Sequence, residues 1–210
     1  MNEINLNLER AKMVEDQLIA NGIVHQDIID AFLNIPRYKF VPEEYKEQSY
    51  NDRPLPIGFS QTISQPFVVA YMLQLLNLNS THKVLEVGTG SGYQTALLCD
   101  MGCRVFSVEL IEELSKRAEE VINSLGFKNV TFVIGDGHYG YKEGSHYDRI
   151  VVSAASETVP DSLIEQLNDQ GGKLVLPVGN EIQRINLITK NGKEVKKKIL
   201  DAVKFVPLIK

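Results

Sequence analysis

The chain has 210 residues and a formal net charge of −5 at neutral pH. Hydrophobic residues make up 43% of the sequence and charged residues 23%, which is ordinary for one globular domain with a large core. The negative charge argues against broad nucleic-acid binding, because contacts to phosphates need a basic face. No apolar run reaches the roughly 18 residues of a membrane helix and the first residues lack a signal-peptide pattern, so we expect a cytoplasmic protein without a membrane partner.

The first 82 residues predict two helices and a loop that cap the rest of the chain. Apolar residues between Leu8 and Leu18 recur at helical spacing, and Asn21-Gly22 ends this helix as a C-terminal cap would. A second short helix is expected around Ile28 to Leu33. Residues 54–64 are rich in Pro, Gly, Ser and Thr, which predicts a loop, and the length of this loop invites a functional explanation.

Residues 83–180 alternate between strand and helix patterns. Apolar runs end at Glu109 and Asp136, and the segment from Ile111 to Leu125 between them follows the helical period. Further strands fit residues 149–153 and 173–177. This alternation predicts an α/β fold with a doubly wound, mostly parallel, Rossmann-like sheet.

Residues 181–210 predict strands of a different kind within the same single domain. Arg184 to Lys190 and Lys193 to Leu200 flank Asn191-Gly192, which is the strongest short hairpin signal. We therefore expect antiparallel C-terminal strands at one end of the sheet.

The two cysteines are candidates for a metal site only at first sight. Cys99 and Cys103 stand four apart in a predicted helix, a spacing at which both thiols can share a face. No histidine lies near enough in the sequence to suggest zinc. We predict small core residues at both positions and no metal.

The segment from Val84 to Gly92 reads Val-Leu-Glu-Val-Gly-Thr-Gly-Ser-Gly. A strand that leads into a glycine turn and a helix is the arrangement by which a parallel sheet presents a nucleotide-like ligand to backbone amides. A dinucleotide fingerprint needs a further glycine three positions after the second one, and Tyr93 occupies that position. No phosphate-binding loop motif occurs either. The spacing therefore indicates a ligand with an adenosine and no phosphates.

Two acidic residues at strand ends support this interpretation. Glu109 can accept hydrogen bonds from both hydroxyls of a ribose, and Asp136 can accept one from an adenine amine. Either residue alone is more often a solvated cap, and a glycine turn alone is often only a tight turn. Their combination in register over about 50 residues predicts an S-adenosylmethionine pocket at the carboxyl ends of three successive strands.

Ser64 stands at a predicted helix start, before Gln65-Pro66. The serine is either an N-cap of that helix or a hydroxyl donor to an anionic substrate group held near the helix start. The spacing favours neither alternative over the other.

The sequence resembles a known family, the protein-L-isoaspartate O-methyltransferases, over nearly its whole length. The most diagnostic matching segments are Leu55-Pro56-Ile57-Gly58, Gln61-Thr62-Ile63-Ser64-Gln65-Pro66, the stretch from Val84 to Thr95, Gly135-Asp136-Gly137 and the terminal Phe205-Val206-Pro207-Leu208. The first two are far more specific than the glycine turn, which many methyltransferases share.

The resemblance implies transfer of a methyl group from S-adenosylmethionine to the free α-carboxylate of an L-isoaspartyl residue. The ester then closes to a succinimide, and hydrolysis of that ring restores some normal aspartate. The implied partners are isoaspartyl-containing proteins and peptides, the implied product is S-adenosylhomocysteine, and we expect a monomer. A carboxylate is already an anion at neutral pH, so the transfer needs positioning and exclusion of water more than a general base.

The resemblance also implies roles for individual residues. Ser64 takes the catalytic position. The cofactor-binding positions are Gly58, Gln61, Thr62, Ile63, Glu86, Gly88, Gly90, Gly92, Glu109, Asp136 and Gly137. The substrate-binding positions are Leu55, Pro56, Ile57, Ser64, Val206 and Pro207. His138 and His146 depart from the family pattern, and we interpret both as exposed loop histidines.

Two alternatives remain open. One is a methyltransferase of the same fold with another small-molecule or protein acceptor, since the fold does not fix the acceptor. The other is a noncatalytic module that binds the adenosyl cofactor. Residues 153–156 read Ser-Ala-Ala-Ser, whereas methylases of nucleic-acid base amines tend to carry an Asn/Asp-Pro-Pro-aromatic segment there, so a nucleic-acid acceptor is disfavoured.

Overall fold

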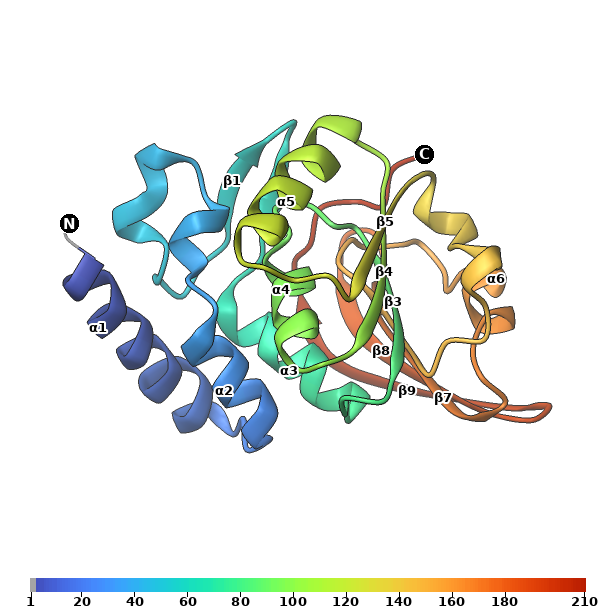
Figure 1. Ribbon diagram of the computed structural model, residues 1–210. Coiled ribbons are helices and arrows are strands. Elements are labelled where there is room, and N and C mark those ends of the chain that lie inside the picture. The colour runs from blue at the N-terminus through green and yellow to red at the C-terminus, as the bar shows by residue number, and fades with distance from the viewer. Residues whose placement is uncertain (1–2) are drawn as a thin grey trace.

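The computed structural model describes residues 3–210 and is built around one seven-stranded sheet (Figure 1). The strand order is β5-β4-β3-β6-β7-β8-β9; neighbours from β5 to β7 are parallel, and β7, β8 and β9 are antiparallel. The bounds are β3 (Lys83–Val87), β4 (Arg104–Glu109), β5 (Val130–Ile134), β6 (Arg149–Val152), β7 (Gln170–Val178), β8 (Gln183–Asn191) and β9 (Glu194–Val203). The predicted fold class, including the antiparallel C-terminal strands, is confirmed.

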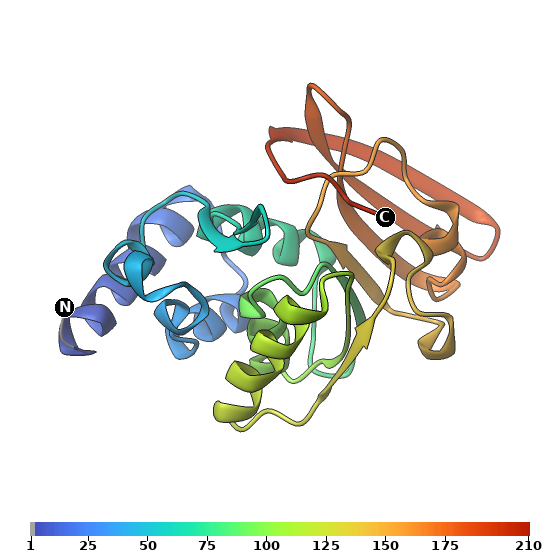
Figure 2. The same cartoon turned by 90° about the horizontal axis from the view of Figure 1, so that it is seen from above.

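Helices cover both faces of this sheet. Figure 1 shows α3, α4 and α5 on one face and α6 on the other, with α1 and α2 outside the first group. Seen from above, the N-terminal helices and the β8–β9 hairpin lie at opposite ends of the molecule (Figure 2). The helix bounds are α1 (Glu3–Met13), α2 (Gln26–Asn34), α3 (Pro66–Leu76), α4 (Tyr93–Asp100), α5 (Glu112–Ser124) and α6 (Asp161–Glu165).

The first predicted helix is present, although its geometry changes along its length. α1 continues into a π-helical turn (Val14–Leu18) and then a 3₁₀ turn (Ile19–Asn21). Gly22 follows with a φ of +90°, a left-handed conformation that closes the helix as predicted. The second predicted helix is α2.

The predicted loop over residues 54–64 is wrong, because this segment forms a two-stranded antiparallel hairpin. Its strands are β1 (Leu55–Gly58) and β2 (Gln61–Ile63), and Phe59 and Ser60 make the turn with φ values of +53° and +57°. The strands are so short that turn-forming residues dominate the composition. The signal that could have revealed β1 is the period of two by which Leu55 and Ile57 are buried while their neighbours are exposed.

The C-terminal hairpin is present with its turn one residue later than predicted. Asn191 pairs with Glu194, so Gly192 and Lys193 are the two loop residues. Gly192 has a φ of +58°, which suits the first position of a tight hairpin turn.

The placement of both cysteines in one helix is wrong. Cys99 lies in α4, whereas Cys103 follows the helix, because Gly102 turns the chain with a φ of +79°. Both cysteines are buried and free, as small core residues are.

Two hydrophobic clusters pack against the two faces of the sheet. Along β3, Val84 belongs to the cluster that includes the N-terminal helices, while Leu85 and Val87 belong to the cluster on the other face. A parallel strand covered on both faces is apolar along its length, and the burial of this area is the main stabilising contribution. Two residues of β3 are not apolar: Lys83 at its start, which is half-buried, and Glu86, which is fully buried.

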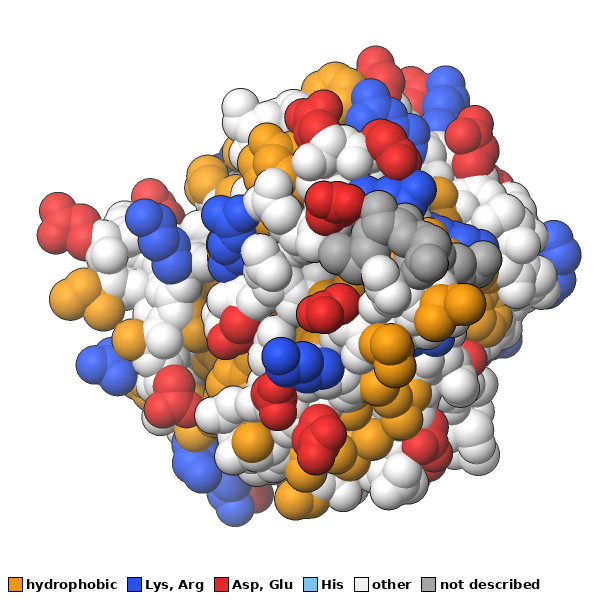
Figure 3. Space-filling view, turned by 90° about the vertical axis from the view of Figure 1, so that its left-hand side faces the viewer, with side chains coloured by type: hydrophobic (Ala, Val, Ile, Leu, Met, Phe, Trp, Pro, Cys, Tyr) orange, Lys and Arg blue, Asp and Glu red, His pale blue; other side chains and the backbone are white. Residues whose placement is uncertain are grey.

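The surface carries both signs of charge. On the face formed by the N-terminal elements, acidic and basic side chains intermingle with apolar ones (Figure 3). Ile4 and Leu8 of α1 are among the exposed apolar side chains. Within residues 3–210, no helix has both the length and the apolar character needed to cross a membrane.

Candidate functional site

A cavity opens at the carboxyl ends of the central strands. It encloses about 790 Å³, part of which is open to solvent. Its walls come from residues 61–64, 87–91, 108–111, 153–154 and 206–209, together with Val69, Tyr93, Gln94 and Gly137. The strand order reverses between β3 and β6, and ligands of open α/β sheets bind at such a switch point. We call this space the main cavity.

The structure brings most of the predicted site residues to the main cavity. Those that line it are Gln61, Thr62, Ile63, Ser64, Gly88, Gly90, Glu109, Gly137, Val206 and Pro207. Those that lie outside its lining are Leu55, Pro56, Ile57, Gly58, Glu86, Gly92 and Asp136. Within the second group, Glu86 accepts a hydrogen bond from the lining residue Gln94.

The three glycines of the turn serve different purposes. Gly88, Gly90 and Gly92 have φ values of +90°, +53° and +85°, a region that side chains rarely adopt. Gly88 and Gly90 line the cavity. A Cβ on Gly92 would lie 2.8 Å from the Cβ of Ala118, so this glycine allows α5 to approach the turn closely.

Glu109 is held at the cavity wall by the backbone. Its Oε2 accepts a hydrogen bond from the Gly90 N–H at 2.8 Å, and its Oε1 accepts one from the Ile111 N–H at 3.0 Å. The side chain is nearly buried, with 7% of its residue surface exposed. A carboxylate has about four lone-pair sites, so acceptor capacity for two ligand hydroxyls remains.

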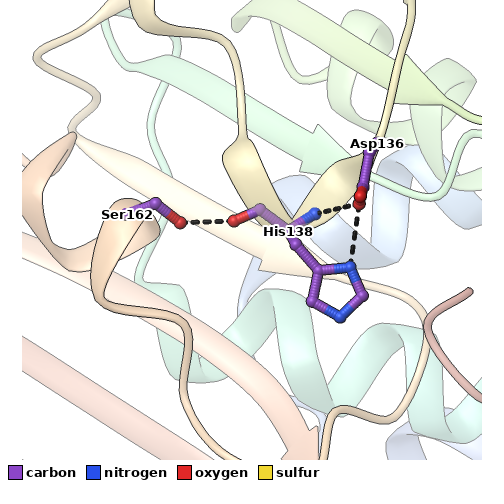
Figure 4. Close-up of polar contacts among 3 residues, drawn as sticks. All are labelled: Asp136, His138 and Ser162. Carbon is purple, nitrogen blue, oxygen red and sulfur yellow. Dashed lines mark hydrogen bonds and ion pairs between the residues drawn. The ribbon is translucent and has the colours of Figure 1, made fainter. Parts of the chain in front are cut away.

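Gly137 and Asp136 lie at the carboxyl end of β5, and only Gly137 lines the cavity. A Cβ on Gly137 would overlap Cγ1 of Val87, so a side chain cannot be accommodated there. Oδ1 of Asp136 accepts the His138 N–H at 2.9 Å and lies 2.8 Å from Nδ1 of the same histidine (Figure 4). Burial raises the pKa of Asp136, but the hydrogen bonds from His138 outweigh this effect and hold the pKa below its ordinary value.

The interpretation of His138 as an exposed loop histidine is wrong. Its side chain is only 22% exposed and its ring contacts Asp136. Ser162 donates its hydroxyl to the main-chain carbonyl of His138 and not to the ring, so the three residues form no nucleophilic relay (Figure 4). His146 is exposed, as predicted.

Glu86 lies behind the cavity at the centre of a polar network. Its oxygens accept hydrogen bonds from Gln94 Nε2 (3.0 Å), Thr95 Oγ1 (2.5 Å) and Ser107 Oγ (2.7 Å). Gln94 also donates to Ser153 Oγ at 2.9 Å, and both residues line the cavity. Burial raises the pKa of Glu86 to about 7, although the three hydrogen bonds lower it.

Ser64 lines the cavity just before α3. The N-cap of α3 is Gln65, no side chain caps this helix, and Pro66 is its first residue. The N-cap interpretation of Ser64 is therefore wrong, because the helix begins one residue later. The Ser64 carbonyl accepts a hydrogen bond from Nη2 of Arg37 at 2.7 Å. Sequence reasoning missed Arg37, since its bond joins residues 27 positions apart.

The C-terminal segment forms another wall. Ala155 donates its N–H to the Val206 carbonyl at 2.8 Å, and the Leu208 N–H donates to the Ala155 carbonyl at 2.8 Å. This bridge fixes residues 206–209 along the cavity. A second cavity adjoins the first and shares four lining residues with it, namely Thr62, Ser64, Ser153 and Val206. We call it the side cavity; it also takes in residues 202–205.

Residues 3–210 contain no group of three or more His, Cys, Asp or Glu side chains that could hold a metal ion. The strand order, the glycine turn and a carboxylate at the switch point are the features that the sequence predicted for an S-adenosylmethionine-dependent methyltransferase. The particular family follows from comparison with known proteins.

The family model described as protein-L-isoaspartate(D-aspartate) O-methyltransferase matches residues 9–210, and the chain belongs to this family. A protein-L-isoaspartate O-methyltransferase of Dictyoglomus thermophilum is 48% identical over 201 residues, which cover 95% of this chain and 90% of that protein.

Two solved structures are similar over almost the whole chain. A structure named protein-L-isoaspartate O-methyltransferase gives a TM-score of 0.87 at 30% identity, and the match covers 94% of this chain and 65% of that one. A Plasmodium falciparum structure described under the same enzyme name, in complex with S-adenosyl-L-homocysteine, gives a TM-score of 0.82 at 26% identity and covers 95% and 98%.

Proposed function

We propose that the protein methylates the free α-carboxylate of L-isoaspartyl residues in damaged proteins and peptides, with Ser64 as the group that binds this carboxylate. The family supports the reaction. The observation that carries the assignment of Ser64 is its position: it lines both the main cavity and the side cavity. A residue on that shared wall can touch a cofactor on one side and a peptide on the other.

The main cavity is the proposed cofactor site. Glu109 would accept hydrogen bonds from the two ribose hydroxyls, since its own backbone partners leave acceptor capacity on both oxygens. The turn at Gly88 and Gly90 would pass beneath the adenosyl group, and Gly137 would let an adenine ring approach β5. When bound, S-adenosylmethionine supplies an electrophilic methyl on a sulfonium.

The remaining predicted cofactor residues have proposed supporting roles. Gln61, Thr62 and Ile63 would cover the cofactor from the hairpin side. Glu86 would act from behind the wall, through Gln94 and Thr95. Asp136, Gly58 and Gly92 would shape the segments that carry the lining residues.

The side cavity is the proposed entrance for the substrate peptide. Its lining is mostly uncharged and includes Val68, Val203 and Phe205, which suits the backbone and apolar groups of an extended peptide. Leu55, Pro56 and Ile57 would hold the hairpin that borders this entrance, and Val206 and Pro207 would contact the peptide from the tail. The residues' task is to orient the carboxylate and exclude water, because no proton has to be removed.

The substitution Ser64→Ala tests the assignment. We expect kcat/KM for an isoaspartyl peptide to fall about 10- to 100-fold, the effect of one hydrogen bond to a charged group. The affinity for S-adenosylhomocysteine and the unfolding free energy should stay unchanged, because the hydroxyl caps no helix. Ser60→Ala is the matched control, since Ser60 is an exposed serine of the same hairpin. Equal activity of Ser64→Ala and the wild type would refute the role.

The oligomeric state, the location and the absence of further partners are also part of the proposal. We infer a monomer that works in the cytoplasm and uses neither nucleic acid nor a membrane as partner. The net charge of −5 supports the expectation about nucleic acid, because phosphate binding needs a basic surface. Sedimentation of the purified protein tests the oligomeric state.

A further inference from the structure

A buried arginine stands directly behind the wall of the main cavity. Arg37 begins the 3₁₀ turn Arg37–Phe40 after α2 and is 0% exposed. Its Nε donates to the Ser49 carbonyl at 2.7 Å and its Nη2 donates to the Ser64 carbonyl at 2.7 Å. Its guanidinium carbon lies 5.0 Å from the centre of the Tyr93 ring. One side chain thus joins the segment before the hairpin, the serine at the cavity and the first residue of α4.

This cation has no carboxylate partner within residues 3–210. Its Nη1 lacks a hydrogen-bond partner there, as do the nearby hydroxyls of Ser49, Tyr50 and Tyr93. Burial lowers the pKa of Arg37 to about 10, so the guanidinium still carries its charge at neutral pH. A buried charge without a carboxylate partner opposes folding, and two carbonyl acceptors offset only part of the desolvation cost. Stability therefore does not account for this arginine.

The contacts of Arg37 do account for it. Ser64 and Tyr93 both line the main cavity, and both are held by the same planar guanidinium. The Ser64 hydroxyl does not cap α3, because Gln65 is the N-cap of this helix. A bond to the Ser64 carbonyl restrains the backbone of this serine relative to α4, which follows the glycine turn. Arg37 thereby restrains the distance between the Ser64 hydroxyl and the glycine turn.

We propose that Arg37 is a positioning residue for methyl transfer, which acts by holding the main chain of Ser64 in register with the cofactor turn. This inference rests on the proposed function and on the proposed role of Ser64. Displacement of a reacting group by about 1 Å can lower a rate about 100-fold, so a clamp of this kind has a measurable effect.

A double-mutant cycle tests the proposal. The variants are Arg37→Met and Arg37→Lys, each alone and combined with Ser64→Ala. We expect Arg37→Met to lower kcat/KM for an isoaspartyl peptide about 10- to 100-fold when Ser64 is present and less than about threefold in the Ser64→Ala background. Arg37→Lys should restore part of the loss, since lysine keeps the charge and can donate to one of the two carbonyls.

Two further measurements separate positioning from folding. Arg37→Met should remain folded in urea titrations and bind S-adenosylhomocysteine within about threefold of the wild type, because a neutral side chain of similar volume removes a buried charge that has no carboxylate partner. Arg149→Met is the matched control: Arg149 also donates to main-chain carbonyls, those of Leu76 and Asp148, and does not line the main cavity. Arg149→Met should change kcat/KM by the same factor with Ser64 present and in the Ser64→Ala background.

Each remaining outcome contradicts the inference in a distinguishable way. Equal losses from Arg37→Met with and without the Ser64 hydroxyl would show that Arg37 does not act through Ser64. Failure of Arg37→Met to fold would make it a stability residue. An inactive wild type would instead overturn the proposed function, and an unaffected Ser64→Ala variant would overturn the role of Ser64, on which the clamp depends.

Discussion

Glu86 and Glu109 illustrate how one residue type takes two roles at neighbouring strand ends. Glu109 lines the cavity and is held by two backbone amides, whereas Glu86 lies behind the wall and is surrounded by side-chain donors. The two backbone bonds fix the position of the Glu109 carboxylate at the wall of the site. Burial favours the neutral form of Glu86. The two residues therefore call for different tests.

Glu109→Ala should weaken binding of S-adenosylhomocysteine by about 1.5 to 3 kcal/mol, the range for hydrogen bonds to a charged group. Calorimetric titration measures this change. Glu112→Ala is the control, since Glu112 is an exposed glutamate in a surface ion pair with Lys116. An unchanged dissociation constant for Glu109→Ala would remove Glu109 from the cofactor site.

Glu86→Gln should change how stability depends on pH. Burial raises the pKa of Glu86 from 4.5 to about 7, so the folded protein holds this proton more tightly than the unfolded chain does. The stabilising contribution of the protonated group is therefore complete below about pH 4.5 and is lost as the pH rises to about 7. Glutamine does not titrate. The unfolding free energy of the variant, relative to that of the wild type, should therefore rise by about 1 to 3 kcal/mol between pH 5 and pH 8.

Urea unfolding at several pH values measures this difference. Asp169→Asn is a suitable control, because Asp169 is exposed and its pKa is lowered by Lys190. A constant difference in unfolding free energy between Glu86→Gln and the wild type across that range would contradict the raised pKa.

At the scale of elements, the sequence predicted the parts that repeat a pattern over many residues. Apolar runs and a helical period identified the strands from β3 to β7 and the helix α5, because a strand buried on both faces and an amphipathic helix leave clear signatures. The hairpin of β1 and β2 left only the short alternation at Leu55 and Ile57, since three- and four-residue strands resemble a loop in composition. Cys103 was misplaced because the single Gly102 ends α4 early.

The close approach of α5 to the glycine turn gives a prediction at this scale. Gly92→Ala would place a Cβ 2.8 Å from the Cβ of Ala118, at a φ of +85°. Gly126→Ala is the matched control, since Gly126 has a φ of +87° and no neighbouring atom within 4 Å.

The control should lose about 1 to 2 kcal/mol of unfolding free energy from its backbone conformation alone. Gly92→Ala should lose about 1 to 3 kcal/mol more from overpacking. Urea titrations of the two variants measure the difference. Equal losses would mean that α5 can move away freely.

For the whole molecule, the main cavity is where the predicted parts of the chain meet. Residues 61–64 come from the N-terminal part (1–82), the strand ends from the central part (83–180) and residues 206–209 from the C-terminal part (181–210). A single domain, and its division into these three parts, remain a proposal. The resemblance that predicted the family is confirmed by the family model and by the relatives.

The candidate site was predictable where a motif carried it and not where tertiary packing did. The glycine turn, Glu109 and Ser64 stand in recognisable local patterns. Arg37 does not, because it reaches Ser64 only after α2 and the hairpin have packed together, and arginine is rarely buried without a partner. His138 was assigned to solvent for a different reason: its contact with Asp136 is local but depends on the conformation of the turn, which the sequence did not reveal.

Methyl transfer to a pair of isomeric peptides tests the central claim most directly. One peptide carries an L-isoaspartyl residue and the other the normal aspartyl residue in the same sequence, and each is incubated with the protein and labelled S-adenosylmethionine. We predict a label on the isoaspartyl peptide alone, as a methyl ester that mild base releases, with succinimide appearing as the ester is lost. Equal labelling of both peptides, a base-stable methyl group, or cofactor binding without any transfer would contradict the account.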